Sequence, residues 1–409
     1  MVNAGDTAWL LVSAALVMLM TPGLALFYGG MVRRKNILST MMMSIAILGL
    51  VGILWVLYGY SLSFGTDIGG FIGGFDFIGL RQVGQEPSST YATTVPHLAY
   101  MIFQAMFAVI TVALVTGSIV ERMKFSALLI FSILWLTMVY CPVAHWVWGS
   151  GGWLARLGAL DFAGGTVVHI TAGVSALALA KLLGPRKGFG AEPMEPNNIP
   201  MVVIGAALLW FGWFGFNAGS ALTAGGLASS AFVATNTSAA AAGITWMALS
   251  WIYRRPSILG MVTGAVVGLV AITPAAGFVP PLAGIPIGIV AAVISYYGML
   301  FRMKRSIDES LDVWACHGLG GTWGALATGI FASVAVNAAG ADGVIMGNAM
   351  QFVKQLAAVG AVWGFAFLAT FGLGKLVDIT VGLRVSKTEE TVGLDISQHG
   401  ERAYGGVLR

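Results

Sequence analysis

Two histidines stand in segments that are too apolar to face water. His169 ends the stretch Asp161-Phe-Ala-Gly-Gly-Thr-Val-Val-His169, and His317 follows Cys316 in a second apolar segment that begins near Asp312. Ionisable groups inside a bilayer are costly and mark pathways by default. A single buried histidine is most often a satisfied core residue, but this chain has two in matching contexts. We therefore interpret the pair as part of a pathway through the membrane.

The two histidines are expected at similar depth. At 1.5 Å per residue of helix, His169 lies roughly 12 Å from Asp161, and His317 lies roughly 18 Å from Arg305. The first of these segments enters the membrane from outside and the second from inside. Two helices of opposite direction would thus place two imidazoles together.

Aromatic and polar residues form two possible ledges at matching depths. Phe103 and Phe107 are four residues apart, so they share one helix face. Phe216 and Ser220 are also one turn apart, on a helix that runs in the opposite direction. The alternative, that these are ordinary structural aromatic residues, is strong. This chain has 22 Phe and 13 Trp, and most such residues in a membrane protein face lipid, the core or the interface.

Asp161 and Asp312 have a structural interpretation. Each opens a helix and is positioned as an N-cap, so we expect Asp161 to join a helix start to its preceding loop rather than to contact substrate. Neither aspartate looks like a catalytic acid, and no catalytic residue is predicted. Cys141 and Cys316 lie in apolar segments without metal-ligand spacing, so we predict small core residues and no metal site.

The elements that must position these residues are transmembrane helices. The chain is 57% apolar and 9% charged, whereas soluble domains carry about 25% charged residues. A spanning helix needs about 20 mainly apolar residues. The predicted spans are 7–30, 37–62, 97–119, 125–146, 162–183, 200–221, 228–252, 257–274, 279–301, 313–336 and 349–379.

The basic residues support this count of eleven. Cytoplasmic loops are enriched in Lys and Arg, and an external N-terminus puts 18 of the 21 basic residues inside. These are Arg33, Arg34, Lys35, Arg122, Lys124, Lys181, Arg186, Lys187, Arg254, Arg255, Arg302, Lys304, Arg305, Lys375, Arg384, Lys387, Arg402 and Arg409. The net charge of +4 therefore marks a membrane face, and no nucleic-acid partner is expected.

The predicted fold is an all-α polytopic membrane protein in a cell membrane, with its C-terminus inside. Residues 1–380 would form one transmembrane transport domain and residues 381–409 a cytoplasmic regulatory tail. Helices one to five and six to ten could form two inverted halves, with an eleventh helix added. Inverted repeats commonly hold a substrate site between them.

Several motifs in this chain resemble those of one known family. They are Pro22-Gly-Leu-Ala-Leu-Phe-Tyr-Gly-Gly30, Phe103-Gln-Ala-Met-Phe107, Asp161 to Ile170, Gly212-Trp-Phe-Gly-Phe-Asn-Ala-Gly-Ser220, His317-Gly, and the tail segment Gly393 to Glu401. In this order and over nearly the whole length, the chain resembles the ammonium transporters of the Amt/Mep/Rh family, in its prokaryotic Amt branch.

The resemblance implies a homotrimer in which each subunit has its own pore. It implies an outer ammonium site of Phe103, Phe107, Trp148 and Ser220, a gate of Phe107 and Phe216, and a lumen with the twin histidines His169 and His317. Asp161 would support the outer site. A PII-type regulatory protein could bind at the cytoplasmic face, and no cofactor is expected.

Three classes of function remain to be weighed. The leading one is an ammonium transporter that deprotonates its substrate and moves the proton separately, with a passive ammonia gas channel as its close alternative. A sensor would need a large cytoplasmic domain, so sensing is at most an added role beside the short tail. A membrane enzyme would need a third metal ligand or a nucleophile near the histidines, and the sequence offers only Cys316.

Overall fold

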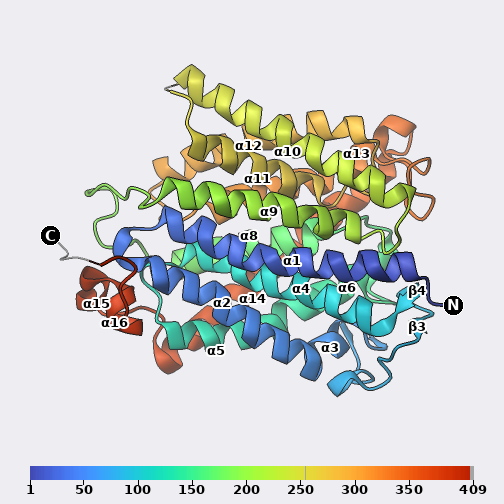
Figure 1. The fold of residues 1–409 in the computed structure, drawn as a ribbon, viewed down its shortest axis with the longest axis horizontal. Helices are drawn as coiled ribbons and strands as arrows, with labels where there is room; N and C mark the ends of the chain where they lie inside the picture. Colours follow the sequence, from blue (N-terminus) through green and yellow to red (C-terminus); the bar gives the residue numbers. More distant parts are fainter. Residues whose placement is uncertain (254, 406–409) are drawn as a thin grey trace.

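Long helices lie side by side in one bundle (Figure 1). The computed structural model describes residues 1–253 and 255–405. Within these residues, eight helices are long and apolar enough to cross a membrane. They are Ala4–Met31 (α1), Arg34–Phe64, His97–Ser118, Phe125–Leu157, Gly165–Leu183, Ile199–Gly219 (α9), Pro281–Lys304 and Ala349–Val381 (α14). An all-helical polytopic protein is therefore confirmed.

Several of these spans contain more than one helical element. The second includes α2 and α3, the fourth α5, α6 and the short α7, and the others include α4, α8 and α12. Their bounds are Ile37–Leu54 (α2), Tyr60–Phe64 (α3), His97–Val115 (α4), Phe125–Trp135 (α5), Cys141–Trp148 (α6), Trp153–Leu157 (α7), Thr171–Leu183 (α8) and Gly284–Lys304 (α12).

The three remaining predicted spans are also helical. They correspond to Gly226–Tyr253 (α10), to Ile258–Ile272 (α11), and to the π-helical segment Trp314–Leu319 followed by Gly320–Phe331 (α13). The tenth span was expected to reach residue 336. It ends at Phe331 because the backbone becomes extended at Ala332 (ψ 145°) and turns so that Ser333 donates a hydrogen bond to the Phe278 carbonyl at 2.8 Å.

Residues 63–96, which lie between the second and third predicted spans, contain short strands that the sequence did not indicate. Two antiparallel hairpins form there. Their strands are Asp67–Ile68 (β1), Ile72–Gly73 (β2), Pro87–Ser88 (β3) and Ala92–Pro96 (β4). Asp67 pairs with Gly73 in the first hairpin and Ser88 with Ala92 in the second. The loop is thus a folded cover rather than an open linker.

The bundle has two distinct ends. Residue 1 and strands β3 and β4 lie at one, called here the N-terminal end, and the tail helices lie at the other, the C-terminal end (Figure 1). The tail helices are Lys387–Val392 (α15) and Leu394–His399 (α16). Arg254 and Arg409, which belong to the predicted basic clusters, and the last residues of the predicted tail, 406–409, lie outside the described residues.

Both histidines lie in π-helical segments, Gly165–Ile170 and Trp314–Leu319. Each segment continues directly into an α-helix, α8 or α13, and π-helical turns often occur at functional sites. The two elements cross very closely, since a Cβ atom on Gly173 would stand 2.1 Å from the Gly318 amide nitrogen. Only glycine permits this approach, which brings the two imidazoles within reach of each other.

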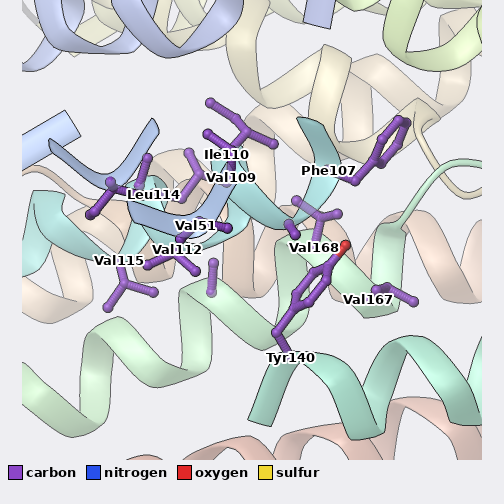
Figure 2. Close-up of a cluster of buried hydrophobic side chains, with 14 of the residues drawn as sticks. Val51, Phe107, Val109, Ile110, Val112, Leu114, Val115, Tyr140, Val167 and Val168 are labelled. Carbon is purple, nitrogen blue, oxygen red and sulfur yellow. The ribbon is translucent and has the colours of Figure 1, made fainter. Parts of the chain in front are cut away.

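The packed core holds the pathway residues in place. Phe107, Val168 and Tyr140 come from three different elements and lie among the buried side chains shown in Figure 2. Phe107 is 1% exposed, and Val168 and Tyr140 are fully buried. Interiors of this density restrict side chains to single rotamers, so the position of Phe107 is set by its neighbours.

Candidate functional site

A cavity of about 340 Å³ lies at the N-terminal end of the bundle. The predicted site residues Phe103, Phe107, Trp148, Asp161 and Ser220 all line it. They come from α4, from the end of α6, from the loop before Gly165–Ile170, and from the residue that follows α9. The structure therefore brings together residues that are up to 117 positions apart in the sequence.

The lining of this cavity is aromatic. Phe107 contacts Phe103 with ring centroids 4.9 Å apart and Trp148 with centroids 5.8 Å apart, both edge to face. The Trp148 indole donates a hydrogen bond to the Asp161 carbonyl at 2.9 Å, which fixes the ring plane. The Ser220 hydroxyl donates to the Phe216 carbonyl at 2.8 Å, so its oxygen lone pairs remain free to accept. Aromatic faces and a hydroxyl acceptor suit a small cation.

Phe107 lines the cavity, and Phe216 packs against it outside the cavity lining. Their rings stack with centroids 4.1 Å apart at an interplanar angle of 26°. Phe216 also lies 6.0 Å from the His169 ring. The two aromatic ledges therefore meet at matching depth, as predicted from the opposite directions of their helices.

Beneath the phenylalanine pair, the two imidazoles contact each other directly. His169 Nδ1 lies 3.2 Å from His317 Nδ1, and the residues are 1% and 4% exposed. His169 also stacks on Trp213, with centroids 5.4 Å apart at 27°. The predicted meeting of His169 and His317 is thus present in the structure.

The neighbours of His169 assign the protons of the pair. Thr273 Oγ1 donates to the Leu269 carbonyl at 2.8 Å and accepts from the Trp213 indole at 2.9 Å. Its remaining lone pair faces His169 Nε2 at 3.3 Å, so this nitrogen is the donor. With neutral rings, His169 Nδ1 then accepts from His317 Nδ1, which leaves His317 Nε2 as an acceptor.

The path continues to the C-terminal end. A narrow space of about 20 Å³, lined by Phe216, His169 and His317 with other aromatic and aliphatic residues, has room for about one water-sized molecule. Next to it, a cavity of about 780 Å³ is lined by His317, Cys316, Asp312 and Tyr28, among others. The narrow, mainly apolar space that contains the imidazoles therefore adjoins the larger cavity, and the Phe107–Phe216 stack separates it from the cavity at the N-terminal end.

Asp161 acts as the cap of the His169 segment. Its carboxylate accepts hydrogen bonds from the amides of Gly164, Gly165, Thr166 and Val167 at 2.6–3.2 Å, and from the Thr166 hydroxyl. It is 8% exposed. The carboxylate thus joins the helix start to its preceding loop, although Asp161 precedes the N-cap position, which Gly164 occupies. The negative charge satisfies the free N–H groups that begin a helix.

The corresponding expectation for Asp312 was wrong. Asp312 pairs with Arg302 at 2.7 Å, and the carboxylate that accepts the Trp314 amide, at 3.2 Å, belongs to Glu309. Burial and the nearby Asp312 charge raise the pKa of Glu309 to about 7. The sequence showed only that acidic residues precede the helical segment of His317. In the structure, Arg302 pairs with Asp312, so Glu309 is the carboxylate that remains free to cap this segment.

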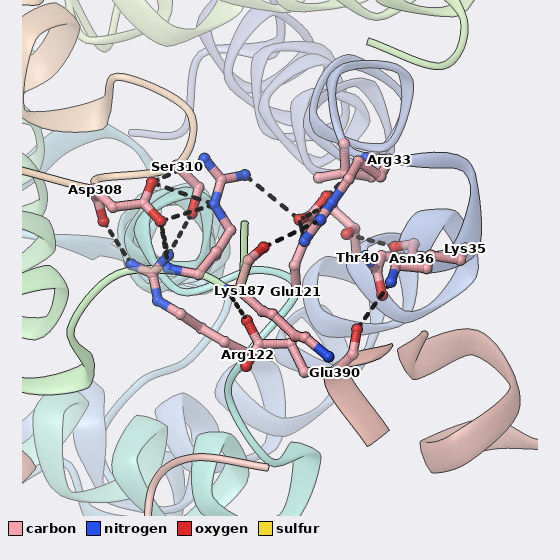
Figure 3. A network of polar contacts seen from close by, with 12 residues as sticks. Arg33, Lys35, Asn36, Thr40, Glu121, Arg122, Lys187, Asp308, Ser310 and Glu390 are labelled. Carbon is pink, nitrogen blue, oxygen red and sulfur yellow. Dashed lines mark hydrogen bonds and ion pairs between the residues drawn. The ribbon is translucent and has the colours of Figure 1, made fainter. Parts of the chain in front are cut away.

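Charged residues form a buried network at the C-terminal end (Figure 3). Arg122 bonds Asp308 at 3.1 Å, Arg186 bonds Asp308 at 2.8 Å, and Arg33 bonds Glu121 at 2.6 Å. Burial raises the pKa of Asp308, but the arginines outweigh it and hold this pKa below its ordinary value. The network therefore ties four connecting segments together while its carboxylates are ionised.

The tail is folded onto this network. Glu390 accepts from the Lys187 amide at 2.6 Å, and Asn36 accepts from the Leu394 amide at 2.8 Å. Asp395 accepts from the Ser39 amide at 2.8 Å, and a capping box joins Ser386 with Glu389. The tail thus docks on loops that belong to the bundle rather than extending into solvent.

Some residues at the site were not singled out from the sequence. Tyr91, Tyr100 and Gln104 line the N-terminal-end cavity, and Thr273 contacts His169. An amide inside the apolar stretch Phe103 to Phe107 was a visible signal for Gln104. No pattern in the sequence links Tyr91 or Thr273 to residues so far away.

Cys141 and Cys316 are buried and free of disulfides. Across residues 1–253 and 255–405, no group of three or more His, Cys, Asp and Glu side chains could hold a metal ion. The fold and the site together define a membrane transport protein with an occluded path through its helices.

Comparison with known proteins identifies the family. The model of the Ammonium Transporter Family matches residues 8–404. Ammonium transporter Amt1 of Archaeoglobus fulgidus is 54% identical over 98% of this chain and 99% of its own length. An ammonium transporter of Bacillus subtilis is 51% identical, with 98% of both chains covered. The chain belongs to the ammonium transporter family, as its motifs predicted.

Solved structures agree with this assignment. The crystal structure of Candida albicans Mep2 superimposes with a TM-score of 0.90 at 36% identity, covering 98% of this chain and 90% of that one. A protein described as a sensor Amt protein gives a TM-score of 0.88 at 27% identity, with 97% and 98% covered. The chain is thus a multi-pass ammonium transporter of the cell membrane and not an enzyme.

Proposed function

We propose that this protein recruits ammonium at an aromatic outer site, removes one proton and conducts ammonia past two histidines, while the proton crosses by a separate route. The observation that carries this proposal is the contact of His169 with His317 directly below the stacked Phe107 and Phe216 rings. A hydrated cation does not fit this passage, whereas ammonia does.

Recruitment depends on the lining of the 340 Å³ cavity. Aromatic faces attract a desolvating cation by roughly 0.5–2 kcal/mol each. Phe103, Phe107 and Trp148 supply such faces, and Ser220 supplies a hydrogen-bond acceptor. Desolvation disfavours the charged form of ammonium, so the ion loses a proton more readily as it descends. Potassium, which is similar in size and charge, has no proton to lose.

The contact of the histidine pair suits a relay. An inward proton must pass from His169 to His317, so both rings first exchange tautomers, and His169 Nδ1 then donates to His317 Nδ1 across the 3.2 Å contact. His317 lines the C-terminal-end cavity, where ammonia and the proton would reunite. Net movement of one charge per ammonium is the result.

We further propose eleven spans with the N-terminal end outside. The eight long apolar helices, with α10, α11 and the segment Trp314–Phe331, make up this number. Arg33, Arg122 and Arg186 gather at the C-terminal end, which the basic-loop rule assigns to the cytoplasm. The His169 and His317 segments cross in opposite directions, which supports two inverted halves.

The remaining assignments follow the family resemblance. We propose a homotrimer, a transport domain over residues 1–380 and a regulatory tail over 381–409. The docking of Glu390 and Asp395 on neighbouring loops supports a regulatory role for the tail. A PII-type protein could act at the same face.

A current measurement tests the proposed mechanism. Purified protein in a supported bilayer should give a transient current on an ammonium pulse, with none on an equal potassium pulse. Uptake of ammonia without current would favour the alternative, a passive ammonia channel, which the apolar 20 Å³ passage also suits. Sensing as an added role is motivated only by the 27% identical sensor Amt protein.

We expect Phe216→Ala to impair conduction more than Phe103→Ala. Phe216 contacts Phe107, Trp213 and His169, with centroids 4.1, 5.6 and 6.0 Å away. Its loss removes one of the two stacked rings that occlude the path, and it also removes the ring that packs against His169. Phe103 is assigned to the recruitment layer, where it contacts Phe107 at 4.9 Å. Ammonium-evoked currents at equal protein amounts measure the difference.

The control for this pair is Phe214→Ala. Phe214 stacks on Phe232 with centroids 3.9 Å apart, away from the passage. The Phe214→Ala variant therefore removes an aromatic ring without changing the passage. Its current should match that of the unmodified protein. Equal residual rates for Phe216→Ala and Phe103→Ala would contradict the assigned order of gate and recruitment site.

Deletion of residues 385–409 should lower transport by about 5-fold or more, the scale of a modest coupling between distant sites. The deletion removes Glu390, which accepts the Lys187 amide, and Asp395, which accepts the Ser39 amide. The loops beside Asp308 then lose support, and Asp308 lies just before the helix of His317. Current at equal protein in the membrane measures the effect.

Val392→Ala is the matched tail control, because Val392 is 45% exposed on α15. It should leave transport unchanged. The deleted protein should keep its trimer and its pores on size-exclusion analysis. Full transport in the deletion would show that the tail has no regulatory function.

A further inference from the structure

His145 is a fully buried polar side chain that the proposed mechanism has not used. It lies on α6, three residues before Trp148, which lines the aromatic cavity at the N-terminal end. Its ring Nδ1 lies 2.9 Å from the Ser63 carbonyl oxygen, and its ring Nε2 lies 3.0 Å from Oδ1 of Asp67. Ser63 ends α3 with Phe64, and Asp67 begins β1, so the imidazole joins α6 to the start of the folded cover.

Both nitrogens of this ring face atoms that accept hydrogen bonds. A backbone carbonyl has no proton to give, so Nδ1 must donate. Oδ1 of Asp67 also accepts from the Gly70 amide at 2.7 Å, and Oδ2 lies 3.7 Å from the Arg156 guanidinium. The hydrogen bond from His145 holds the pKa of Asp67 below its ordinary value, with smaller contributions from Gly70 and Arg156. Asp67 is therefore an ionised carboxylate, Nε2 must donate as well, and the ring carries a positive charge.

A glycine turn encloses this pair. A Cβ atom on Gly149 would stand 2.4 Å from the His145 Nδ1 atom, and a Cβ atom on Gly151 would stand 2.6 Å from the Asp67 Cβ atom. The turn after α6 can pass directly over both side chains because these two residues are glycine. Such close packing keeps water from the imidazolium, so the carboxylate compensates its charge. Removing one partner of a buried pair leaves an uncompensated charge, which is strongly unfavourable.

The bonded segment also holds one wall of the aromatic cavity. The carbonyl of Phe64, one residue after Ser63, accepts a hydrogen bond from the Tyr91 hydroxyl at 2.7 Å. The same hydroxyl accepts from the Ser150 amide at 3.0 Å. Tyr91 lines the cavity and stacks on Tyr100 with centroids 5.5 Å apart at 10°. A displacement of the Ser63 end of α3 is therefore transmitted to the Tyr91 ring.

We infer that His145 is a positioning residue for the outer site, in which a buried imidazolium ties the cover to α6 and so sets the affinity for ammonium. This inference rests on the proposed function of the cavity. His145 itself does not line the cavity, so it makes no contact with substrate there. It acts through Tyr91 on the cover and Trp148 on its own helix, whose relative position it fixes.

His145→Gln should weaken the outer site without stopping conduction. A single amide nitrogen cannot replace two ring nitrogens that face different partners, so the cover loses one of its two bonds to α6. We expect the half-saturating ammonium concentration to rise roughly 5-fold or more, the scale of a coupling between separate sites. The maximal current should be retained because His169 and His317 are unchanged. Currents over an ammonium concentration series measure both quantities.

Asp67 gives a second test from the more exposed side of the pair. Its side chain is 24% exposed, so Asp67→Ala should remain folded, and it should raise the half-saturating concentration as His145→Gln does. Asp67→Asn keeps an acceptor oxygen but no charge, so the ring should lose one proton and the concentration should be intermediate. Asp76→Asn is the matched control, because Asp76 accepts the Thr66 amide at 2.8 Å in the same loop. It should change neither the ring nor the concentration.

Nuclear magnetic resonance of isotope-labelled histidine nitrogens, with the protein in lipid bilayers, reads the protonation of the ring without any transport. The signals of His145 are those that disappear in His145→Gln. At neutral pH they should show two protonated nitrogens. A bare ring nitrogen in the unmodified protein would overturn the charge on His145, and a doubly protonated ring in Asp67→Asn would overturn its dependence on Asp67.

The outcomes separate this inference from the proposed function. An unmodified protein without ammonium-evoked current would refute the electrogenic mechanism and leave the protonation result standing. A conducting protein in which His145→Gln and Asp67→Ala are folded, by thermal unfolding, and keep the unmodified half-saturating concentration would overturn the positioning role. A loss of maximal current at an unchanged half-saturating concentration would also overturn it, because His145 would then act on the passage instead of the outer site.

Discussion

His169→Ala and His317→Ala are each expected to abolish selective ammonium transport while the protein remains folded. The two Nδ1 atoms lie 3.2 Å apart in a passage that is otherwise mainly apolar, so either change breaks the only imidazole chain there among the described residues. Positioned proton-transfer groups typically contribute 10²–10⁴-fold to a rate, so the ammonium-evoked current should fall by roughly 100-fold or more. Currents in supported bilayers, with ammonium and potassium pulses, are the measurement.

His97→Ala provides the control for a buried histidine outside the passage. His97 is 5% exposed and bonds the Tyr60 hydroxyl at 2.5 Å, near the N-terminal-end cover. Its replacement should cost some stability but leave an ammonium-selective current. Normal current and normal selectivity in either pathway variant would refute the relay. Conduction of potassium by a variant would show instead that the histidines act as a filter.

Asp161→Ala is expected to reduce the amount of folded protein as well as transport. The carboxylate accepts four backbone amides and one hydroxyl at the start of the His169 segment. Hydrogen bonds to a charged group contribute about 1.5–3 kcal/mol each, and the freed amides would be left buried. A loss of roughly 3 kcal/mol or more in the free energy of unfolding follows. The yield of monodisperse protein and its thermal unfolding are the measurements.

Asp161→Asn separates structure from substrate contact. Asparagine has a single acceptor oxygen, so it can accept hydrogen bonds from only some of the backbone N–H groups that Asp161 binds. The yield of folded protein should therefore be intermediate. Transport by the folded fraction should recover in the same proportion if Asp161 acts through the fold. A fully stable Asp161→Ala protein that does not transport would argue for direct contact with ammonium instead.

The physical separation of roles explains how a small cation can be selected without a ring of charges. The cavity at the N-terminal end contains aromatic faces and acceptors, and the passage contains apolar walls and imidazoles. Under the proposed mechanism, a cation is attracted by the first region and excluded by the second. Only a cation that can release a proton would then pass both, and this property distinguishes ammonium from potassium.

The sequence by itself determined the class, the spans and the family. The long apolar segments require a bilayer rather than water as their surroundings, and segments in a bilayer must be helical to satisfy their backbone hydrogen bonds. Most of the helix ends could be predicted to within a few residues. Period and direction also placed Phe107 opposite Phe216 and His169 opposite His317, because helix geometry converts spacing into depth. Asp161 was recognised as a cap since its small, polar context is local.

Tertiary structure alone decided which distant groups complete the site. Thr273 orients His169, and Tyr91 comes to the N-terminal-end cavity through a folded hairpin that the residues 63–96 did not indicate. Glu309 caps its helix because Arg302 pairs with Asp312. These are outcomes of competition among hydrogen-bond partners in three dimensions. A linear pattern reports the donors and acceptors but not which of them meet.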